Sequence, residues 1–378
     1  MTFRQDQGNH AQPDRGDIVE FGGPTRPRWR WLGRLALACL VVAAVVVIVA
    51  RQGHHRNPPA PPPVAVTTVG HSLLGVRSGW ELFGLDQGGL VSVQFASGRI
   101  TRTVLPPPEG DGLVSLVPGA GKVLIRPLDD VPGYVVPDGQ PARQLTGILA
   151  RGALLLPGPD PSELWDIGST QPIALVGADG KAKTTALATL FGQFPPQSAM
   201  ADGRGNVLIF DNSGHQYDAG PGLLRPVDAL VVAVGPRTWL GLSCGQHGDC
   251  RNVVITAATG ATRVLPGPAV SVLNWPWPSQ PGVVAPDGSM AAVVVQGYTD
   301  AAALELLNLR SGAMTSVAVP IGPLASSQTI AWSPDSRWLF VVTATGRLAA
   351  IDPHTGQVRY PDLGLSGLSQ IAIRSAAS

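Results

Sequence analysis

The chain has 378 residues, of which 44% are apolar and 14% are charged, and its formal net charge is +1. This apolar content allows a packed core, and the near balance of acids and bases excludes the basic footprint of a nucleic-acid-binding domain. The 46 glycines and 36 prolines favour a fold of short strands joined by many turns.

The N-terminal segment predicts a disordered tail followed by a transmembrane helix. Residues 1–30 are mostly polar and show no apolar periodicity, which is typical of a disordered tail. Leu35–Ala50 then contains no charged residue, and with Trp31, Leu32 and Gly33 the apolar run reaches about twenty residues, enough to cross a bilayer while Arg34 snorkels. We therefore predict a single transmembrane helix over residues 31–51, which would contact the lipid bilayer.

The flanking charges predict the orientation of this helix. Four arginines precede the uncharged run Leu35–Ala50 and two follow it, and cytoplasmic flanks carry the excess of Arg and Lys. They are Arg26, Arg28, Arg30 and Arg34 before the run, and Arg51 and Arg56 after it. The N-terminus is thus expected in the cytoplasm and the C-terminal domain outside the cytoplasmic membrane. A cleavable signal peptide fits less well because Ile48-Val49-Ala50 is a poor small-x-small site, and lipidation at Cys39 would require the apolar run to end there.

Residues 52–70 are expected to form a proline-rich stem, because the segment 57–63 reads NPPAPPP and favours extended polyproline structure. The remaining residues, 71–378, carry a repeated turn. Its glycines lie 38 to 52 residues apart, each between two short apolar runs, and they are Gly98, Gly139, Gly180, Gly222, Gly260, Gly312 and Gly356. A strand–turn–strand period near 40 residues predicts an all-β ectodomain with the architecture of a seven-bladed β-propeller.

The strands of several blades can be predicted individually. The second blade is expected to contain strands at 114–117, 122–126, 133–136 and 143–146; the fifth at 229–234, 238–243, 252–257 and 261–265; and the seventh at 329–332, 338–343, 347–351 and 357–360. The first blade has strands at 80–85, 90–95 and 99–105 but lacks a convincing innermost strand. The leftover C-terminal segment 368–373 is predicted to fill that position and close the ring, with 72–76 as a competitor.

Two units resemble the TolB-type (WD40-like) propeller repeat. The resemblance is carried by Ala285-Pro286-Asp287-Gly288 leading to Ser311-Gly312, and by Ser333-Pro334-Asp335-Ser336 leading to Thr355-Gly356. It covers about a quarter of the chain specifically. It implies an extracytoplasmic binding or assembly module, often without catalytic residues in its repeats.

Two cysteines, Cys244 and Cys250, bracket a seven-residue segment between the second and third strands of the fifth blade. Outside the cytoplasm this spacing predicts a disulfide that fixes the shape of the loop. The alternatives are free or transient thiols, and a metal site that adds His247 and Asp249, although the spacing matches no standard zinc motif. The residues 241–245 formally match G-x-S-x-G, but a strand rather than a helix is expected after Ser243, so we predict no catalytic residue there.

The long connections predict a binding face. The segments 128–132, 244–250, 267–282 and 296–303 should all emerge at one edge of the sheets, and they contribute Trp275, Trp277, Tyr298, Asp300 and His247 as candidate binding residues. Exposed tryptophans favour interaction hot spots, whereas the competing interpretation is that these two fill space between blades. The sequence therefore predicts a non-enzymatic scaffold that binds an envelope or membrane protein, or another ligand, without metal or cofactor. The alternative is a propeller enzyme, a lyase or quinone-type dehydrogenase with its site at the central channel.

Overall fold

The computed structural model describes residues 64–86, 89–106, 114–127, 133–146, 154–167, 173–177, 181–183, 198–210, 215–245, 249–270, 282–296, 302–321, 328–365 and 367–375. The chain divides into two compact units, Met1–Pro59 and Ala60–Ser378, and all described residues belong to the second. The predicted tail and the predicted transmembrane segment 31–51 lie outside them. Within the described ranges, no helix has the length and apolar character needed to span a membrane.

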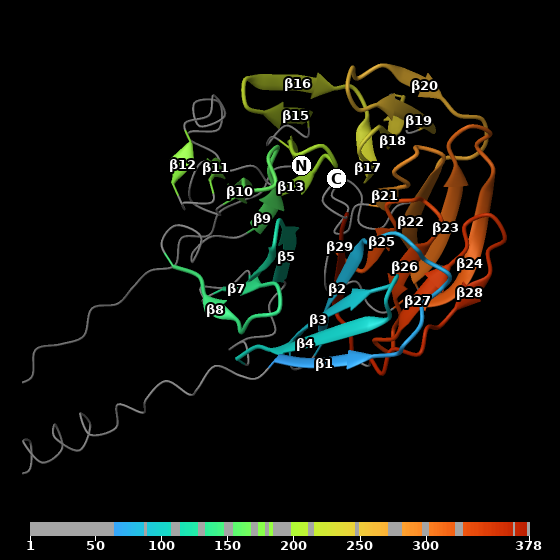
Figure 1. Ribbon diagram of the computed structural model, residues 1–378. Coiled ribbons are helices and arrows are strands. Elements are labelled where there is room, and N and C mark those ends of the chain that lie inside the picture. Colours follow the sequence, from blue (N-terminus) through green and yellow to red (C-terminus); the bar gives the residue numbers. More distant parts are fainter. Residues whose placement is uncertain are drawn as a thin grey trace, which may run out of the picture. The chain divides into compact units, whose positions relative to one another are not determined.

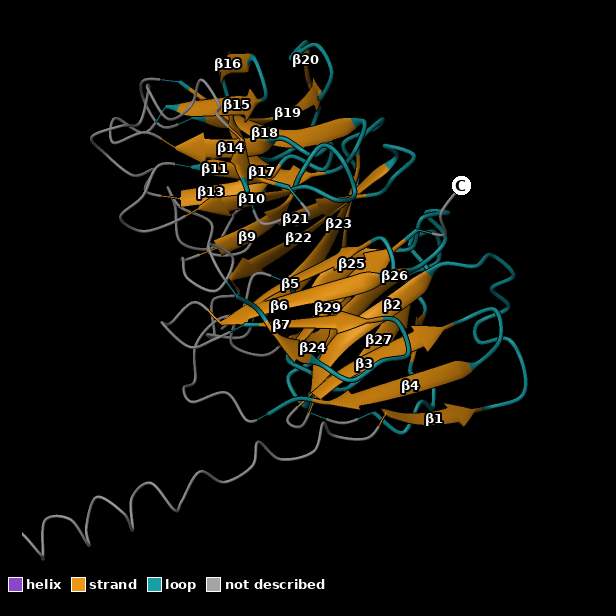
Figure 2. Ribbon diagram, turned by 60° about the vertical axis from the view of Figure 1, so that its left-hand side comes forward, coloured by secondary structure: helices purple, strands orange, loops and turns teal. Residues whose placement is uncertain are grey.

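Every regular element in the described residues is a β-strand (Figure 2). The strands form six sheets in a propeller-like arrangement, and Figure 1 shows these sheets placed around a common centre. Five of them, each with four or five strands, are blades of this arrangement. The sixth has eight strands and divides into two halves of four, which meet through parallel pairing of their innermost strands.

We name the sheets A to F in chain order and give their strands from the outer edge inward. Sheet A contains β1 (Val64–Thr68), β4 (Arg99–Val104), β3 (Gly89–Gln94), β2 (Glu81–Asp86) and β29 (Gln370–Arg374). Sheet B contains β8 (Arg143–Gln144), β7 (Tyr134–Pro137), β6 (Lys122–Pro127) and β5 (Val114–Gly119). Sheet C contains β12 (Ala182–Lys183), β11 (Ala174–Val176), β10 (Leu164–Ile167) and β9 (Leu154–Pro157).

The remaining sheets follow the same plan. Sheet D contains β16 (Leu223–Val227), β15 (Gln216–Gly220), β14 (Val207–Phe210) and β13 (Ser198–Ala201). The first half of sheet E contains β20 (Thr262–Val264), β19 (Cys250–Thr256), β18 (Thr238–Cys244) and β17 (Leu230–Val234), and the second half contains β24 (Met314–Ile321), β23 (Ala302–Asn308), β22 (Met290–Gln296) and β21 (Gly282–Val284). Sheet F contains β28 (Val358–Arg359), β27 (Leu348–Ile351), β26 (Leu339–Val342) and β25 (Ile330–Trp332).

The C-terminal strand takes the innermost position of sheet A, as the sequence predicts. β29 pairs antiparallel with β2, so Ile373 lies opposite Leu82 and Ile371 opposite Gly84. The competing segment 72–76 forms no strand. Because β29 and β2 come from opposite ends of the described chain, this pairing closes the ring and covers an edge that would otherwise expose unpaired backbone groups.

The strand predictions for sheets B and F and for the first half of sheet E are confirmed to within two residues at most ends, but β1 was not expected. Val64–Thr68 fall inside the range predicted as stem, yet they pair with β4 over five residues as a fifth strand of sheet A. Their sequence, VAVTT, is rich in β-branched residues, which favour strands, but it follows directly on the proline run.

The repeated turn glycines have the expected backbone geometry. Gly98, Gly139, Gly222, Gly260, Gly312 and Gly356 all take φ angles between 66° and 75°, a region that L-residues with a side chain rarely adopt. Gly180 lies outside the described residues. The period in the sequence is therefore a period of hairpins that need a left-handed residue.

Apolar clusters fill the seams between neighbouring sheets. At the seam between sheets A and F, Trp80 stacks on Phe95 with ring centroids 4.7 Å apart, and Phe340 from sheet F contacts both rings. Comparable clusters lie at each following seam and between the halves of sheet E. Sheets packed on both faces explain why the strands read as short apolar runs.

Replacing Ile371 by alanine should destabilise the ring at its closure. Ile371 is 1% exposed within the seam cluster of sheets A and F, and truncating such a side chain costs about 2–5 kcal/mol of unfolding free energy. Urea unfolding of the full chain, followed by tryptophan fluorescence, measures this. Val66→Ala is the matched control because Val66 on β1 is 52% exposed and should change stability by less than about 0.5 kcal/mol. Equal midpoints for the two variants would contradict the closure role.

Candidate functional site

The structure tests the sequence-predicted site residues only in part. Trp275, Trp277, Tyr298, Asp300 and His247 all lie outside the described residues. Cys244 and Cys250 are described and form the predicted disulfide, which joins the end of β18 to the start of β19. Neither cysteine is therefore a free thiol in this structure. Among the described residues, no group of three or more His, Cys, Asp or Glu side chains is placed to hold a metal ion.

A cavity of about 840 Å³ lies at the seam between sheets A and B. We call it the A/B cavity. One wall is the face of β2, β3 and β4, and the other is formed by two turns of sheet B at 118–121 and 137–139. The cavity shares Phe83, Leu90, Val123 and Val136 with the apolar cluster of this seam, and it extends beyond them toward the two turns of sheet B.

The strand register arranges the sheet A wall in rows. In the first row Arg374, Glu81, Gln94 and Arg99 are successive cross-strand neighbours. In the second row, Phe83 is followed by Ser92 and Thr101, and in the third Leu90 is followed by Thr103; these lists follow from the same pairing. Side chains in such rows share one face of the sheet. The first row is thus polar along its whole length, whereas the second and third rows change from apolar to polar toward β4.

An ion-pair network closes the inner end of the A/B cavity. One guanidinium nitrogen of Arg374 lies 2.5 Å from Glu81 and 2.7 Å from Asp138, and the other donates to the carbonyl oxygen of Gly119 at 3.0 Å. The Arg374 guanidinium also lies over the ring of Phe83. Burial alone would lower the pKa of Arg374, but the bonds to Asp138 and Glu81 outweigh it, so the pKa is raised and the charge is kept. These carboxylates are therefore committed to linking sheets A and B.

The outer part of the same wall carries uncommitted polar groups. The hydroxyls of Thr101 and Thr103 and the guanidinium of Arg99 make no hydrogen bond or ion pair with another described residue, whereas Ser92 donates to Glu81. The Gln94 side chain accepts only a long bond of 3.4 Å from Ser97. Hydroxyl, amide and guanidinium groups can bind a polar molecule, and no general acid, base and nucleophile are brought together among them.

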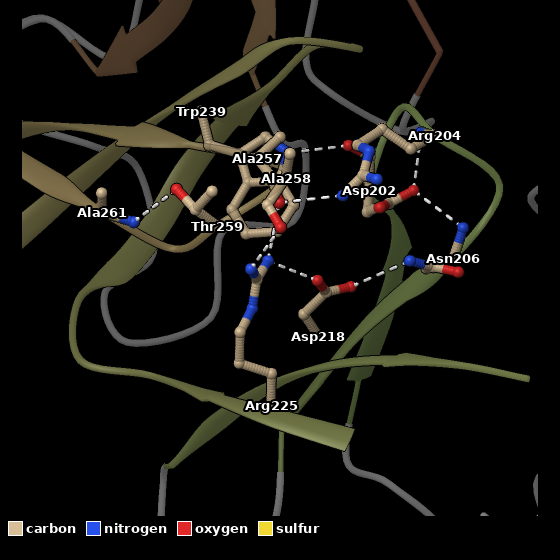
Figure 3. Close-up of polar contacts among 10 residues, drawn as sticks. All are labelled: Asp202, Arg204, Asn206, Asp218, Arg225, Trp239, Ala257, Ala258, Thr259 and Ala261. Atoms are coloured by element: carbon tan, nitrogen blue, oxygen red, sulfur yellow. Dashed lines mark hydrogen bonds and ion pairs between the residues drawn. The ribbon is translucent and has the colours of Figure 1, made fainter. Parts of the chain in front are cut away.

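A second polar cluster joins sheet D to the first half of sheet E (Figure 3). Asp202 lies in the β13–β14 turn, where its Oδ1 accepts the backbone N–H groups of Arg204 and Asn206 at 2.6 and 2.8 Å. The carbonyl of Asp202 accepts the indole N–H of Trp239 from β18, and that of Gly205 accepts the indole N–H of Trp165 from sheet C. This turn is therefore held from both neighbouring sheets.

Arginines extend the cluster across the seam. Arg225 on β16 pairs with Asp218 at 2.6 Å and donates to the carbonyls of Ala257 and Ala258 in the β19–β20 turn, and Arg204 also donates to Ala257. Figure 3 shows both arginines directed at this turn. The arrangement binds one blade to the next, so we assign it a structural role. Sequence reasoning missed it because Asp202-Gly203 resembles any exposed turn.

Burial dominates the electrostatics of the buried aspartates. Asp202 and Asp218 are both fully buried, and burial raises the pKa of each; for Asp218 the nearby Asp202 charge adds to the rise, while Arg225 opposes it. Burial likewise raises the pKa of Asp166, against the effect of Arg126, with which it forms an ion pair of 2.8 Å between sheets B and C. The native state therefore holds protons on these groups more tightly than the unfolded chain does.

Comparisons with known proteins assign no family to this chain. No family model matches it, and no curated protein does. Similar solved structures include TolB from Acinetobacter baumannii (11% identity, 84% of this chain and 88% of that one, TM-score 0.41). They also include the periplasmic gluconolactonase of Pseudomonas aeruginosa (14%, 79% and 99%, 0.44) and a puromycin-hydrolyzing peptidase of Mycobacterium tuberculosis (13%, 78% and 52%, 0.49). At these identities and TM-scores they carry no argument about activity.

Replacing Asp202 by asparagine should flatten the pH dependence of stability. Because the pKa of Asp202 is raised on folding, its protonated form stabilises the native state, and that contribution is lost as the pH rises above about 4, the ordinary pKa of an aspartate, and through the raised pKa. Asparagine keeps an oxygen acceptor for the two backbone N–H groups but does not ionise. Urea unfolding of the full chain at several pH values measures the slope. Asp335→Asn, at an exposed turn, should retain the wild-type profile, and an unchanged Asp202→Asn profile would contradict this assignment.

Proposed function

We propose that this chain is a membrane-anchored, extracytoplasmic, seven-bladed β-propeller that acts as a non-enzymatic binding scaffold for an envelope or membrane protein. The main support for this proposal is the closed ring, in which β29 completes sheet A as its innermost strand. Because the strands of such a ring are used for packing, its connections and seams are the parts available to bind a partner, as in many binding folds. The likeness of two units to the TolB-type repeat agrees with this role.

The count of seven rests on how sheet E is divided. Its two halves, β17–β20 and β21–β24, each have the four-strand order of sheets B, C, D and F. Each half also shares an apolar cluster with the other across their common border, as separate blades do. Counting them as two blades gives seven with the five single sheets.

The disulfide supports a location outside the cytoplasm. Cys244 and Cys250 are bonded, and such bonds persist in oxidising compartments. The predicted helix at 31–51 and its arginine-rich N-terminal flank are consistent with the same placement of the C-terminal domain. The sequence predicts that the connections carrying the candidate binding residues leave the sheets at the same edge as the segment between Cys244 and Cys250; these residues are Trp275, Trp277, Tyr298, Asp300 and His247.

The composition of the innermost strands favours a scaffold over an enzyme with a site at the channel. β5, β9, β13, β17, β21, β25 and β29 are built mainly from Val, Leu, Ile and Ala as far as the structure describes them. A lyase or quinone-type dehydrogenase centred on the channel would need ionisable side chains to converge there. Apart from Arg374 of β29, which is paired with Glu81 and Asp138, the innermost strands carry no ionisable side chain as far as the structure describes them.

The orientation can be measured on cells that express the full chain. A protease that does not cross the cytoplasmic membrane should digest the chain near the predicted stem from outside, because residues 52–70 are expected on that side. Cys244 and Cys250 should react with a membrane-impermeant thiol reagent only after reduction. Protection of the C-terminal domain in intact cells, with digestion after lysis, would overturn the proposed orientation.

The binding face can be tested by crosslinking the full chain in its membrane, followed by affinity capture and mass spectrometry. A specific envelope protein should be captured by the wild type and lost, by about tenfold or more, in a Trp275→Ala/Trp277→Ala variant, since hot-spot tryptophans carry much of an interface's energy. Trp29→Ala is a control of the same residue type on the cytoplasmic side of the predicted helix. Capture that persists in the double variant would contradict the proposed role of these two tryptophans in binding.

A further inference from the structure

We propose that the A/B cavity binds a carbohydrate that carries a carboxylate group, with the sugar on the polar rows of sheet A and the acid at Arg99. This site lies apart from the proposed protein-binding face. The cavity is lined by the turns at 118–121 and 137–139 of sheet B, whereas the disulfide lies at the opposite ends of the strands of its sheet. The two proposals can therefore fail separately.

The volume and the wall both fit a small ligand. A cavity of about 840 Å³ lies within the range of small-molecule sites, which is roughly 300–1,000 Å³. Its wall is formed by regular strands rather than by long loops, so the polar groups are held in fixed register. A site on strands of a closed ring is preorganised, which lowers the entropic cost of binding.

The uncommitted groups match the chemistry of sugars. Thr101 and Thr103 present hydroxyls, and Gln94 presents an amide, each of which can both donate and accept a hydrogen bond. A sugar hydroxyl also does both, so such groups can pair without leaving an unsatisfied atom.

The charges select an acidic form of that ligand. Glu81 and Asp138 are both paired with Arg374, and this set keeps a net charge of −1, so an acidic group is favoured away from it, beside Arg99. Arg99 adjoins Gln94 in the first row, and its guanidinium has no carboxylate partner among the described residues. A guanidinium beside neutral hydrogen-bonding groups fits a carboxylate on a polyhydroxylated molecule.

A peptide fits this site less well. Extended peptides bind by adding a strand at a sheet edge, or by placing apolar anchors in pockets. The wall of the A/B cavity is the face of a sheet whose strands β2, β3 and β4 are paired on both sides. Its apolar ring, Phe83, is 2% exposed and lies beneath Arg374.

The test is an array of immobilised neutral and carboxylated oligosaccharides, read with the labelled full-length protein. Wild type should bind carboxylated members. Thr101→Val, which removes one hydroxyl and keeps the side-chain shape, should weaken binding about 3- to 10-fold, and Arg99→Gln about tenfold or more while reducing the preference for acidic over neutral members.

Matched controls separate the cavity from the rest of the molecule. Thr67→Val lies on β1 opposite Ile100, which packs against sheet F rather than lining the cavity, and Arg237→Gln removes an exposed arginine of the first half of sheet E. Both should bind as the wild type does, and so should Trp275→Ala/Trp277→Ala, whose effect belongs to the protein-binding face. Unchanged urea unfolding of Thr101→Val and Arg99→Gln shows that a loss of binding is local.

Several results would overturn the proposal. They are absence of binding to every carboxylated member, binding that Thr101→Val and Arg99→Gln leave unchanged, and equal binding of neutral and acidic members by the wild type. Binding of peptides but not sugars at this wall would do the same. Failure of the wild type to capture any envelope protein, with sugar binding retained, would count against the scaffold proposal alone.

Discussion

The pairing of β29 with β2 is the constraint on which the rest of the structure depends. Each blade buries its faces against its two neighbours, so no blade is complete until the first and the last sheets meet. The last strand of the described chain meets this need by joining the first sheet. Residues more than 280 positions apart in the chain, such as Glu81 and Arg374, become direct neighbours. The cost of closing so long a loop is offset by the backbone pairs and apolar contacts at the seam of sheets A and F.

Closure also explains why polar groups gather where they do. Most seams are filled by apolar clusters, and buried polar atoms serve to tie one sheet to the next, as in the turn at Asp202 and the ion pair of Arg126 with Asp166. The A/B seam departs from this rule at the ends of the strands next to the turns at 118–121 and 137–139, where the wall formed by β3 and β4 is polar. The incomplete packing at that end leaves space that side-chain chemistry can use.

Much of the fold could be predicted from the sequence, because hairpin turns that need a left-handed glycine recur at a steady period, and because the apolar segment 368–373 had no other place. β1 was missed since Val64–Thr68 follow a proline run and offer no turn signal. The A/B cavity was missed for another reason. The alternation of Arg99, Thr101 and Thr103 with Ile100 marks one polar face of a strand, but the sequence does not say which sheet that face meets. The predicted tryptophan-containing connection lies outside the described residues, so that part of the candidate site stays a prediction.

The position of β1 has a mechanical consequence. β1 directly follows the proline-rich segment and forms the outer edge of sheet A, while β29 forms its inner edge. Tension that reaches Val64 along the strand axis is shared among the five residue pairs between β1 and β4 at once, rather than breaking them one at a time. The load then spreads through β4, β3 and β2 to the strand that closes the ring. Sheet A thus contains both the strand that follows the proline-rich segment, β1, and the strand that closes the ring, β29, so force applied to β1 is transmitted to β29.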